Sequence, residues 1–95
     1  MKNSNQLRTG NSIMNFPKND LFTTCRNFLN LFDDYMQKSE DQGKDDLVEY
    51  FADSFDKLEA LSRKLMDGEE ATLALRNQIR MLVKETEKMA IAEFH

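Results

Sequence analysis

Hydrophobic residues between positions 20 and 36 recur with the spacing of an α-helix. When each residue is placed 100° further round than the last, eight of them fall within an arc of about 140°. These residues are Leu21, Phe22, Cys25, Phe28, Leu29, Phe32, Tyr35 and Met36. Pro17 and Asn19 suit a helix start, and Gly43 suits the end of the polar stretch that follows. The pattern predicts a helix over about residues 19–39 that is buried on one broad side.

A second run of hydrophobic residues predicts a helix over about residues 46–67. Its apolar side consists of Leu47, Val48, Tyr50, Phe51, Phe55, Leu58, Leu61 and Leu65. Asp46 followed by Glu49 has the spacing of a capping box, which favours a helix start at Asp46. On the outer side, Asp53 precedes Lys57 by four residues, a spacing that adds a few tenths of a kcal/mol to an exposed helix.

A third apolar arc predicts a helix over about residues 69–94, made by Leu75, Ile79, Leu82, Val83, Met89 and Ala90. Between this helix and the second, Gly68 suits a helix end, and Asp67 with Glu70 forms another possible capping box. A heptad frame nevertheless runs through the boundary, at Leu47, Ser54, Leu61, Gly68, Leu75, Leu82 and Met89. The alternative is therefore one long helix in a coiled-coil dimer. We expect a turn, because a continuous helix would leave much apolar surface exposed on a monomer.

The three segments together predict an all-α fold, a three-helix bundle with helices at about 19–39, 46–67 and 69–94. The chain has 95 residues, enough for one small domain. Residues 1–18 are rich in Asn and Ser and have few large apolar groups, so we expect a disordered tail there and a single helical domain over 19–95. Met1 and Met14 are both candidate starts of the chain.

Composition and charge limit the partners and the cellular location that we expect for the protein. The formal net charge is −4, whereas proteins that coat DNA are usually basic. The chain has one cysteine, and so no intramolecular disulfide, and no stretch approaches 18 consecutive apolar residues. The N-terminus lacks the hydrophobic run of a secretory signal. We therefore expect a cytoplasmic protein that makes no membrane contact.

The sequence offers little catalytic or metal-binding chemistry. Cys25 lies in the middle of the first apolar arc, and the only histidine is the terminal His95, so we expect a buried thiol rather than a nucleophile. The loop around Gly43 resembles an EF-hand, but with Gly43 at the sixth position the first ligand position holds Lys38. No phosphate-binding glycine motif is present. We predict no catalytic residue, no cofactor and no metal, and therefore no enzyme.

The third helix carries a row of basic residues at four-residue spacing. Like charges at this spacing cost helix stability, so helix formation alone does not favour the row. Three hydrophobic residues off the main apolar arc lie in or beside the same sector. The candidate partner-binding residues are Leu73, Arg76, Arg80, Met81, Lys84, Lys88 and Ile91. The sector is either a docking face for another protein or a solvated face with scattered apolar residues.

These features favour a small non-enzymatic interaction module that inhibits, adapts or chaperones a larger partner protein. A homodimer is also possible, because the acidic outer side of the second helix, at Glu49, Asp53 and Asp56, is complementary in charge to the basic row of the third helix. The alternative function is an accessory factor in nucleic-acid metabolism, such as a phage-type inhibitor of a host nuclease or polymerase. Direct nucleic-acid contact is disfavoured, because residues 69–95 hold four basic groups beside five acids.

Overall fold

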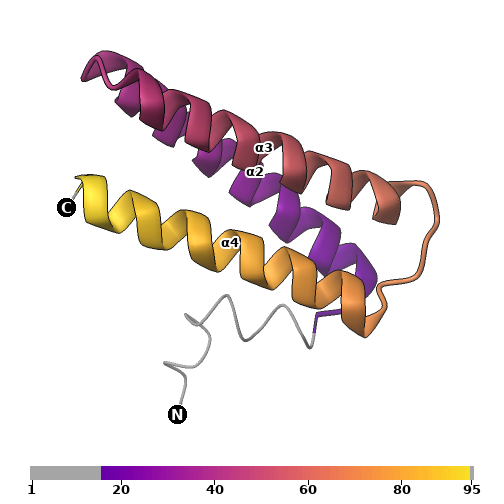
Figure 1. Ribbon diagram of the computed structural model, residues 1–95. Coiled ribbons are helices and arrows are strands. Elements are labelled where there is room, and N and C mark those ends of the chain that lie inside the picture. Colours follow the sequence, from indigo (N-terminus) through magenta and orange to yellow (C-terminus); the bar gives the residue numbers. More distant parts are fainter. Residues whose placement is uncertain (1–15, 95) are drawn as a thin grey trace, which may run out of the picture.

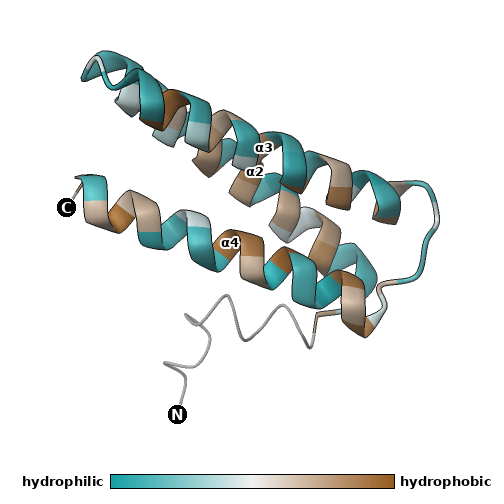
Figure 2. Ribbon diagram, in the orientation of Figure 1, coloured by the Kyte–Doolittle hydropathy of each residue, from teal (hydrophilic) through white to brown (hydrophobic). Residues whose placement is uncertain are grey.

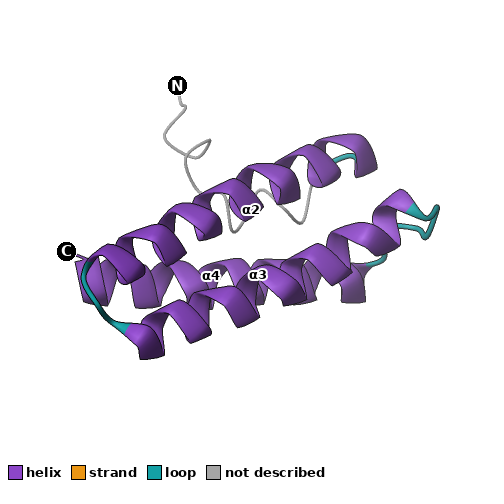
Figure 3. Cartoon of the chain, turned by 90° about the horizontal axis from the view of Figure 1, so that it is seen from above, coloured by secondary structure: helices purple, strands orange, loops and turns teal. Residues whose placement is uncertain are grey.

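The computed structural model describes residues 16–94, which form three α-helices and contain no strand. Helix α2 spans Lys18–Asp41, α3 spans Asp45–Met66 and α4 spans Leu73–Phe94. The chain reverses direction after α2 and again after α3, so that α4 returns toward the turn between α2 and α3 (Figure 1). Short connections join the helices (Figure 3). The predicted three-helix, all-α fold is confirmed.

A glycine ends each of the first two helices in the same way. Gly43 and Gly68 have φ of 70° and 96°, in the left-handed region that favours glycine. After α3, the Gly68 N–H donates to the Leu65 carbonyl at 3.2 Å, and the Glu69 N–H donates to the Lys64 carbonyl at 3.0 Å. Two such bonds form a Schellman motif, which satisfies the last carbonyl groups of the helix. The alternative of one continuous helix through Gly68 is therefore wrong.

The helix starts differ from those that the sequence predicted. The third helix begins at Leu73, four residues later than position 69, because residues 67–72 form the connection. Neither predicted capping box forms: Asp67 follows the last residue of α3, and α3 begins at Asp45 without a side-chain cap. Instead, the Thr72 hydroxyl accepts a hydrogen bond from the Leu75 N–H at 3.1 Å. Thr72 is thus the cap of α4.

The apolar sides predicted for the three helices face one another and form the core. Figure 2 shows hydrophobic and hydrophilic positions alternating along each helix, as expected of amphipathic helices. Helix α3 packs most extensively on α2, whereas α4 makes far fewer contacts with either. The buried residues of the main cluster are Leu21, Cys25, Phe28, Leu29, Phe32, Leu58, Leu65, Leu75, Ile79 and Val83.

Aromatic rings join all three helices at the end where α4 finishes. The ring centroids of Tyr35 and Phe51 are 5.2 Å apart, and those of Phe51 and Phe94 are 5.8 Å apart. Phe51 is fully buried, so this contact fixes the C-terminal turn of α4 against α2 and α3. At the molecular surface nearby, Lys44 Nζ lies 3.8 Å from Glu93 Oε1.

Arg76 joins three segments at the opposite end of the bundle. Its Nε donates to the Ala71 carbonyl at 2.7 Å, and its guanidinium also donates to the Phe16 carbonyl. The side chain therefore ties the start of α4 to the connection before it and to the residues that lead into α2. Phe16 itself packs against the core.

The two ends of the chain, residues 1–15 and 95, are not among the described residues. The disordered tail expected over residues 1–18 stays a prediction, because residues 1–15 lie outside the described residues; α2 itself begins at Lys18. His95 also lies outside them. Among residues 16–94, no helix has the length and hydropathy needed to cross a membrane.

Candidate protein-docking face

Helix α4 buries a narrow stripe and leaves a broad outward face. The buried stripe consists of Leu75, Ile79, Val83, Thr86 and Ala90. Three large hydrophobic side chains on other sides of the helix remain exposed: Leu73 by 71%, Met81 by 44% and Ile91 by 65%. In residues 16–94, the only other large hydrophobic side chain this exposed is Met66. Exposed hydrophobic side chains are thus concentrated on α4.

The four basic residues of the predicted row do not have equivalent positions. Lys84 and Lys88 are exposed and lie on the same outward side as Leu73 and Ile91. Arg80 is half-buried at the edge of this side, where its Nη2 donates to Asn77 Oδ1 at 2.9 Å. We define the α4 outer face as Leu73, Met81, Lys84, Lys88 and Ile91.

Arg76 does not belong to the α4 outer face. Its guanidinium donates to the carbonyl groups of Ala71 and Phe16, and it is half-buried there. The four-residue spacing could not reveal this role, because Phe16 is far from Arg76 in the sequence. The structure therefore brings five of the seven predicted residues together, with Arg80 beside them and Arg76 turned toward the start of α2.

Sequence reasoning missed an apolar groove of about 330 Å³ between α3 and α4. Its walls are formed by Lys57, Ala60, Leu61, Lys64, Gln78 and Leu82. Leu61 and Leu82 are only half-buried, although both were predicted as core residues. The heptad frame contained both leucines, but their meeting at an open groove depends on the angle at which α4 lies against α3. We call this the α3–α4 groove.

A second groove lies between α2 and α3. It has a volume of about 380 Å³, and its charged lining is mixed, with Arg26 and Arg63 beside Glu59 and Asp67. Arg63 Nη2 lies 3.7 Å from Glu59 Oε2, and both side chains are well exposed. Exposed charges of both signs neutralise one another and do not converge on one ligand charge.

The titratable groups with shifted pKa values are not gathered in either groove. Cys25 is fully buried, as predicted, and burial raises the pKa of its thiol from 9.0 to about 11. Burial also raises the pKa of Glu87, and burial together with the negative charge of Glu87 raises the pKa of Tyr35. A buried neutral thiol is a poor nucleophile.

Metal ligands do not cluster in the described part of the chain. No group of three or more His, Cys, Asp or Glu side chains within residues 16–94 could hold a metal ion. Comparison with known proteins gives no further assignment, since no family model, curated protein or solved structure matches the chain.

Proposed function

We propose that this protein is a non-enzymatic interaction module that docks the α4 outer face on a larger partner protein and so inhibits, adapts or chaperones it. The observation that carries the proposal is the exposure of Leu73, Met81 and Ile91 on one helix beside Lys84 and Lys88. Full burial of an exposed side chain of this kind is worth about 1.5–3 kcal/mol, and these partly exposed side chains would gain part of that on docking. Leu73 and Ile91 lie near opposite ends of α4, with Met81 between them, so the three provide apolar contacts along most of the length of the helix.

The spacing of this face suits recognition of a helix by a groove. Leu73, Met81, Lys84, Lys88 and Ile91 recur at intervals that keep one side of a helix against a partner. The lysines favour a partner groove with acidic residues at its rim. Such complementary charges increase the association rate and select the orientation.

A protein partner is favoured over nucleic acid. Of the four basic residues in the α4 row, Arg76 donates to backbone carbonyl groups and Arg80 donates to Asn77. Phosphate binding by the row would therefore rest chiefly on Lys84 and Lys88. Two lysines give weak and strongly salt-dependent binding to a phosphate backbone.

The proposal predicts that charge reversal on α4 removes the partner. Full-length protein carrying Lys84→Glu and Lys88→Glu should capture the partner from host lysate at least about tenfold less than wild type, because the reversed charges oppose an acidic groove. Leu73→Ser with Ile91→Ser should have the same effect, at little cost to folding, because both side chains are exposed. Quantitative mass spectrometry identifies the partner, and calorimetry on the purified pair measures the loss.

The matched control is Arg26→Glu with Arg63→Glu, which changes the net charge equally at the α2–α3 groove. This variant should bind the partner like wild type. Equal binding by wild type and by both α4 variants would exclude the α4 outer face as the docking surface. Circular dichroism of each variant shows whether the helices remain intact.

A further inference from the structure

One side of α3 carries six residues at alternating intervals of four and three. We call this set the α3 stripe, and it consists of Asp46, Tyr50, Asp53, Lys57, Ala60 and Lys64. On a helix they fall within about 80° of one another. Tyr50 is half-buried and the other five are exposed. Residues at these intervals lie along one side of a helix, so a second helix laid along that side of α3 would meet all six.

The charges of the α3 stripe are arranged so that two copies complement each other when antiparallel. Its N-terminal half carries Asp46 and Asp53, and its C-terminal half carries Lys57 and Lys64. Residues 46 and 64 are equally far from position 55, and so are residues 53 and 57. When a second copy of α3 lies antiparallel with its position 55 opposite position 55 of the first, Lys64 faces Asp46 of the other copy and Lys57 faces Asp53. A parallel copy would oppose like charges, which is unfavourable.

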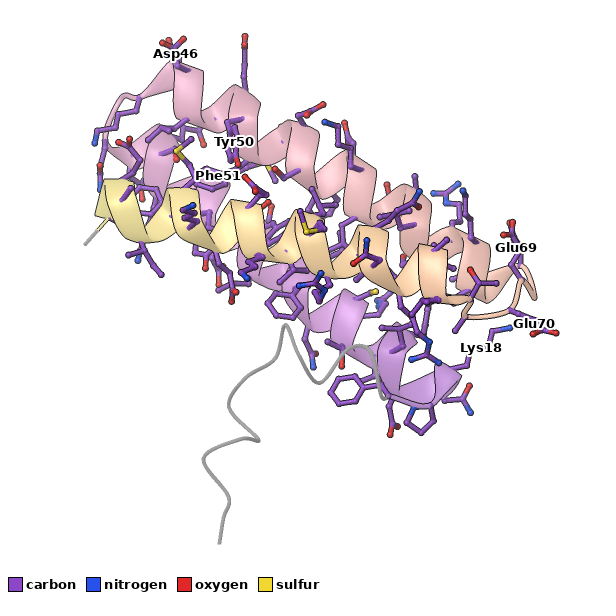
Figure 4. The ribbon with its side chains drawn as sticks, turned by 60° about the horizontal axis from the view of Figure 1, so that its bottom comes forward. Lys18, Asp46, Tyr50, Phe51, Glu69 and Glu70 are labelled. Carbon is purple, nitrogen blue, oxygen red and sulfur yellow. The ribbon has the colours of Figure 1, made fainter. Side chains whose placement is uncertain are left out.

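The α3–α4 groove lies at the C-terminal half of the same stripe. Lys57 and Lys64 stand at its rim, and Ala60 with Leu61 and Leu82 provides its apolar surface. The antiparallel arrangement brings Tyr50 of the second copy opposite Ala60, because residues 50 and 60 are also equally far from position 55. The Tyr50 hydroxyl donates to the Glu85 carbonyl of its own chain at 3.4 Å, so the ring lies against its own α4. The antiparallel pairing places this ring, flanked by two aspartates, beside an apolar groove flanked by two lysines. Figure 4 shows Asp46 and Tyr50 at the N-terminal end of α3, away from the connection that holds Glu69 and Glu70.

We propose that the α3 stripe is a self-association surface, through which two copies of this chain pair antiparallel and cover each other's α3–α4 groove. The existing pair between Lys57 Nζ and Asp53 Oδ2, 2.9 Å apart within one chain, does not prevent this. Both side chains are more than 60% exposed, and such pairs contribute only a few tenths of a kcal/mol. Lys57 can therefore exchange one aspartate for another across the interface.

This surface is distinct from the α4 outer face. Gln78 and Leu82 line the groove, whereas Leu73, Lys84 and Ile91 lie more than 100° away around the same helix by the helical rule. Met81 and Lys88 lie nearer, about 60° and about 80° from Gln78. A dimer formed through the α3 stripe would therefore leave Leu73, Lys84 and Ile91 of both copies accessible. Self-association and docking of a larger partner can thus be tested separately.

Sedimentation equilibrium of the full chain tests the proposal. At about 50 mM salt, protein at about 1 µM to about 1 mM should pass from monomer to dimer, and about 500 mM salt should weaken the dimer because exposed charges are screened. Lys57→Glu with Lys64→Glu should raise the dissociation constant at least about tenfold, and Asp46→Lys with Asp53→Lys should do the same. A chain that stays monomeric throughout, or a dimer that neither double variant weakens, overturns the proposal.

Mixing the Lys57→Glu, Lys64→Glu variant with the Asp46→Lys, Asp53→Lys variant tests whether complementary charges restore the dimer. One variant has an acidic stripe and the other a basic stripe, so a heterodimer should form in which all four charged positions are paired. Arg26→Glu with Arg63→Glu has the same net charge as the acidic-stripe variant, and it should bind the basic-stripe variant at least about tenfold more weakly. Equal binding by both would show attraction by net charge alone and overturn the proposal. Lys84→Glu with Lys88→Glu should leave dimerisation unchanged.

Carbodiimide cross-linking of the wild-type protein tests the antiparallel orientation. This reagent joins an amine directly to a carboxylate in contact with it. Asp46 and Lys64 lie 18 residues apart on one helix, about 27 Å at 1.5 Å per residue, so a bond between them must join two chains. Peptides from the cross-linked dimer should contain the Asp46–Lys64 bond. Its absence from that dimer overturns the antiparallel pairing.

Discussion

Burial determines the chemistry of Cys25. The side chain is fully buried in the main cluster, and it packs in α2 between helix turns that contribute Leu21, Phe28 and Leu29 to the same core. Transfer of a thiolate into this environment is unfavourable, so the pKa of the thiol is raised to about 11. The residue therefore acts as a small hydrophobic side chain.

The raised pKa predicts slow reaction of Cys25 in the native protein. A disulfide reagent at pH 8 should modify the thiol at least about a hundredfold faster in denaturant than in buffer, because the native thiol is both inaccessible and protonated. Absorbance of the released thiolate measures both rates. Equal rates would contradict the burial of Cys25.

The same shift gives a pH dependence of stability. The pKa of the thiol is higher in the folded protein than its ordinary value of 9.0, so this contribution to folding is complete below pH 9 and is lost as the pH rises toward about 11. The difference in unfolding free energy between wild type and Cys25→Ala should shrink over this interval. A difference that stays constant from pH 8 to pH 11 would show that the thiol does not titrate differently on folding.

At the scale of the helices, the way α2 ends explains how α3 begins. The Gly43 N–H donates to the Glu40 carbonyl at 3.0 Å, and the Lys44 N–H donates to the Ser39 carbonyl at 2.9 Å. The Lys44 carbonyl in turn accepts hydrogen bonds from the first turn of α3. Helix α3 therefore begins at Asp45, and Asp46 is already a helical residue that cannot act as the N-cap.

The start of α4 depends on the hydroxyl of Thr72. Thr72→Ala should lower the free energy of unfolding by about 1 kcal/mol, because the Leu75 N–H loses the acceptor 3.1 Å away. Thr72→Ser keeps the hydroxyl and should retain most of that stability. Urea denaturation followed by circular dichroism measures both changes. Similar losses in the two variants would contradict a capping role.

In the molecule as a whole, the contact between α2 and α3 is more extensive than the contact of α4 with these two helices. Helices α2 and α3 form a closely packed pair, and the small side chains Ser39, Ser54 and Ser62 of these helices are buried. Helix α4 contacts this pair mainly through one buried stripe and the Phe94 ring. Fewer contacts mean that less free energy opposes its local opening.

This inequality predicts the order in which the helices exchange their amide hydrogens. The central amides of α4, around Val83, should exchange on the order of tenfold faster than those of α2 around Cys25, because α4 can detach while α2 and α3 remain packed. Hydrogen exchange measured by mass spectrometry or NMR gives both rates. Equal protection of the two segments would show that the bundle opens only as a unit.

Local pattern was enough to predict the three amphipathic helices and the residue that ends each of the first two. The burial of Cys25 followed from its position in an apolar arc, and Gly43 and Gly68 end helices because a positive φ is open to glycine at little cost. The helix starts were harder to predict. A side-chain cap works only at the residue just before the first turn of a helix, and the length of each connection determines which residue that is.

The sequence by itself therefore determined the elements, most of their inward sides and the burial of Cys25, because these depend on neighbours within a few turns of helix. Only the tertiary structure decided where the outer surfaces meet. It turned Arg76 toward Phe16, left Leu61 and Leu82 at an open groove, and brought that groove beside Lys57. Such contacts depend on how closely and at what angle α4 approaches α3, and no interval along the chain specifies either quantity.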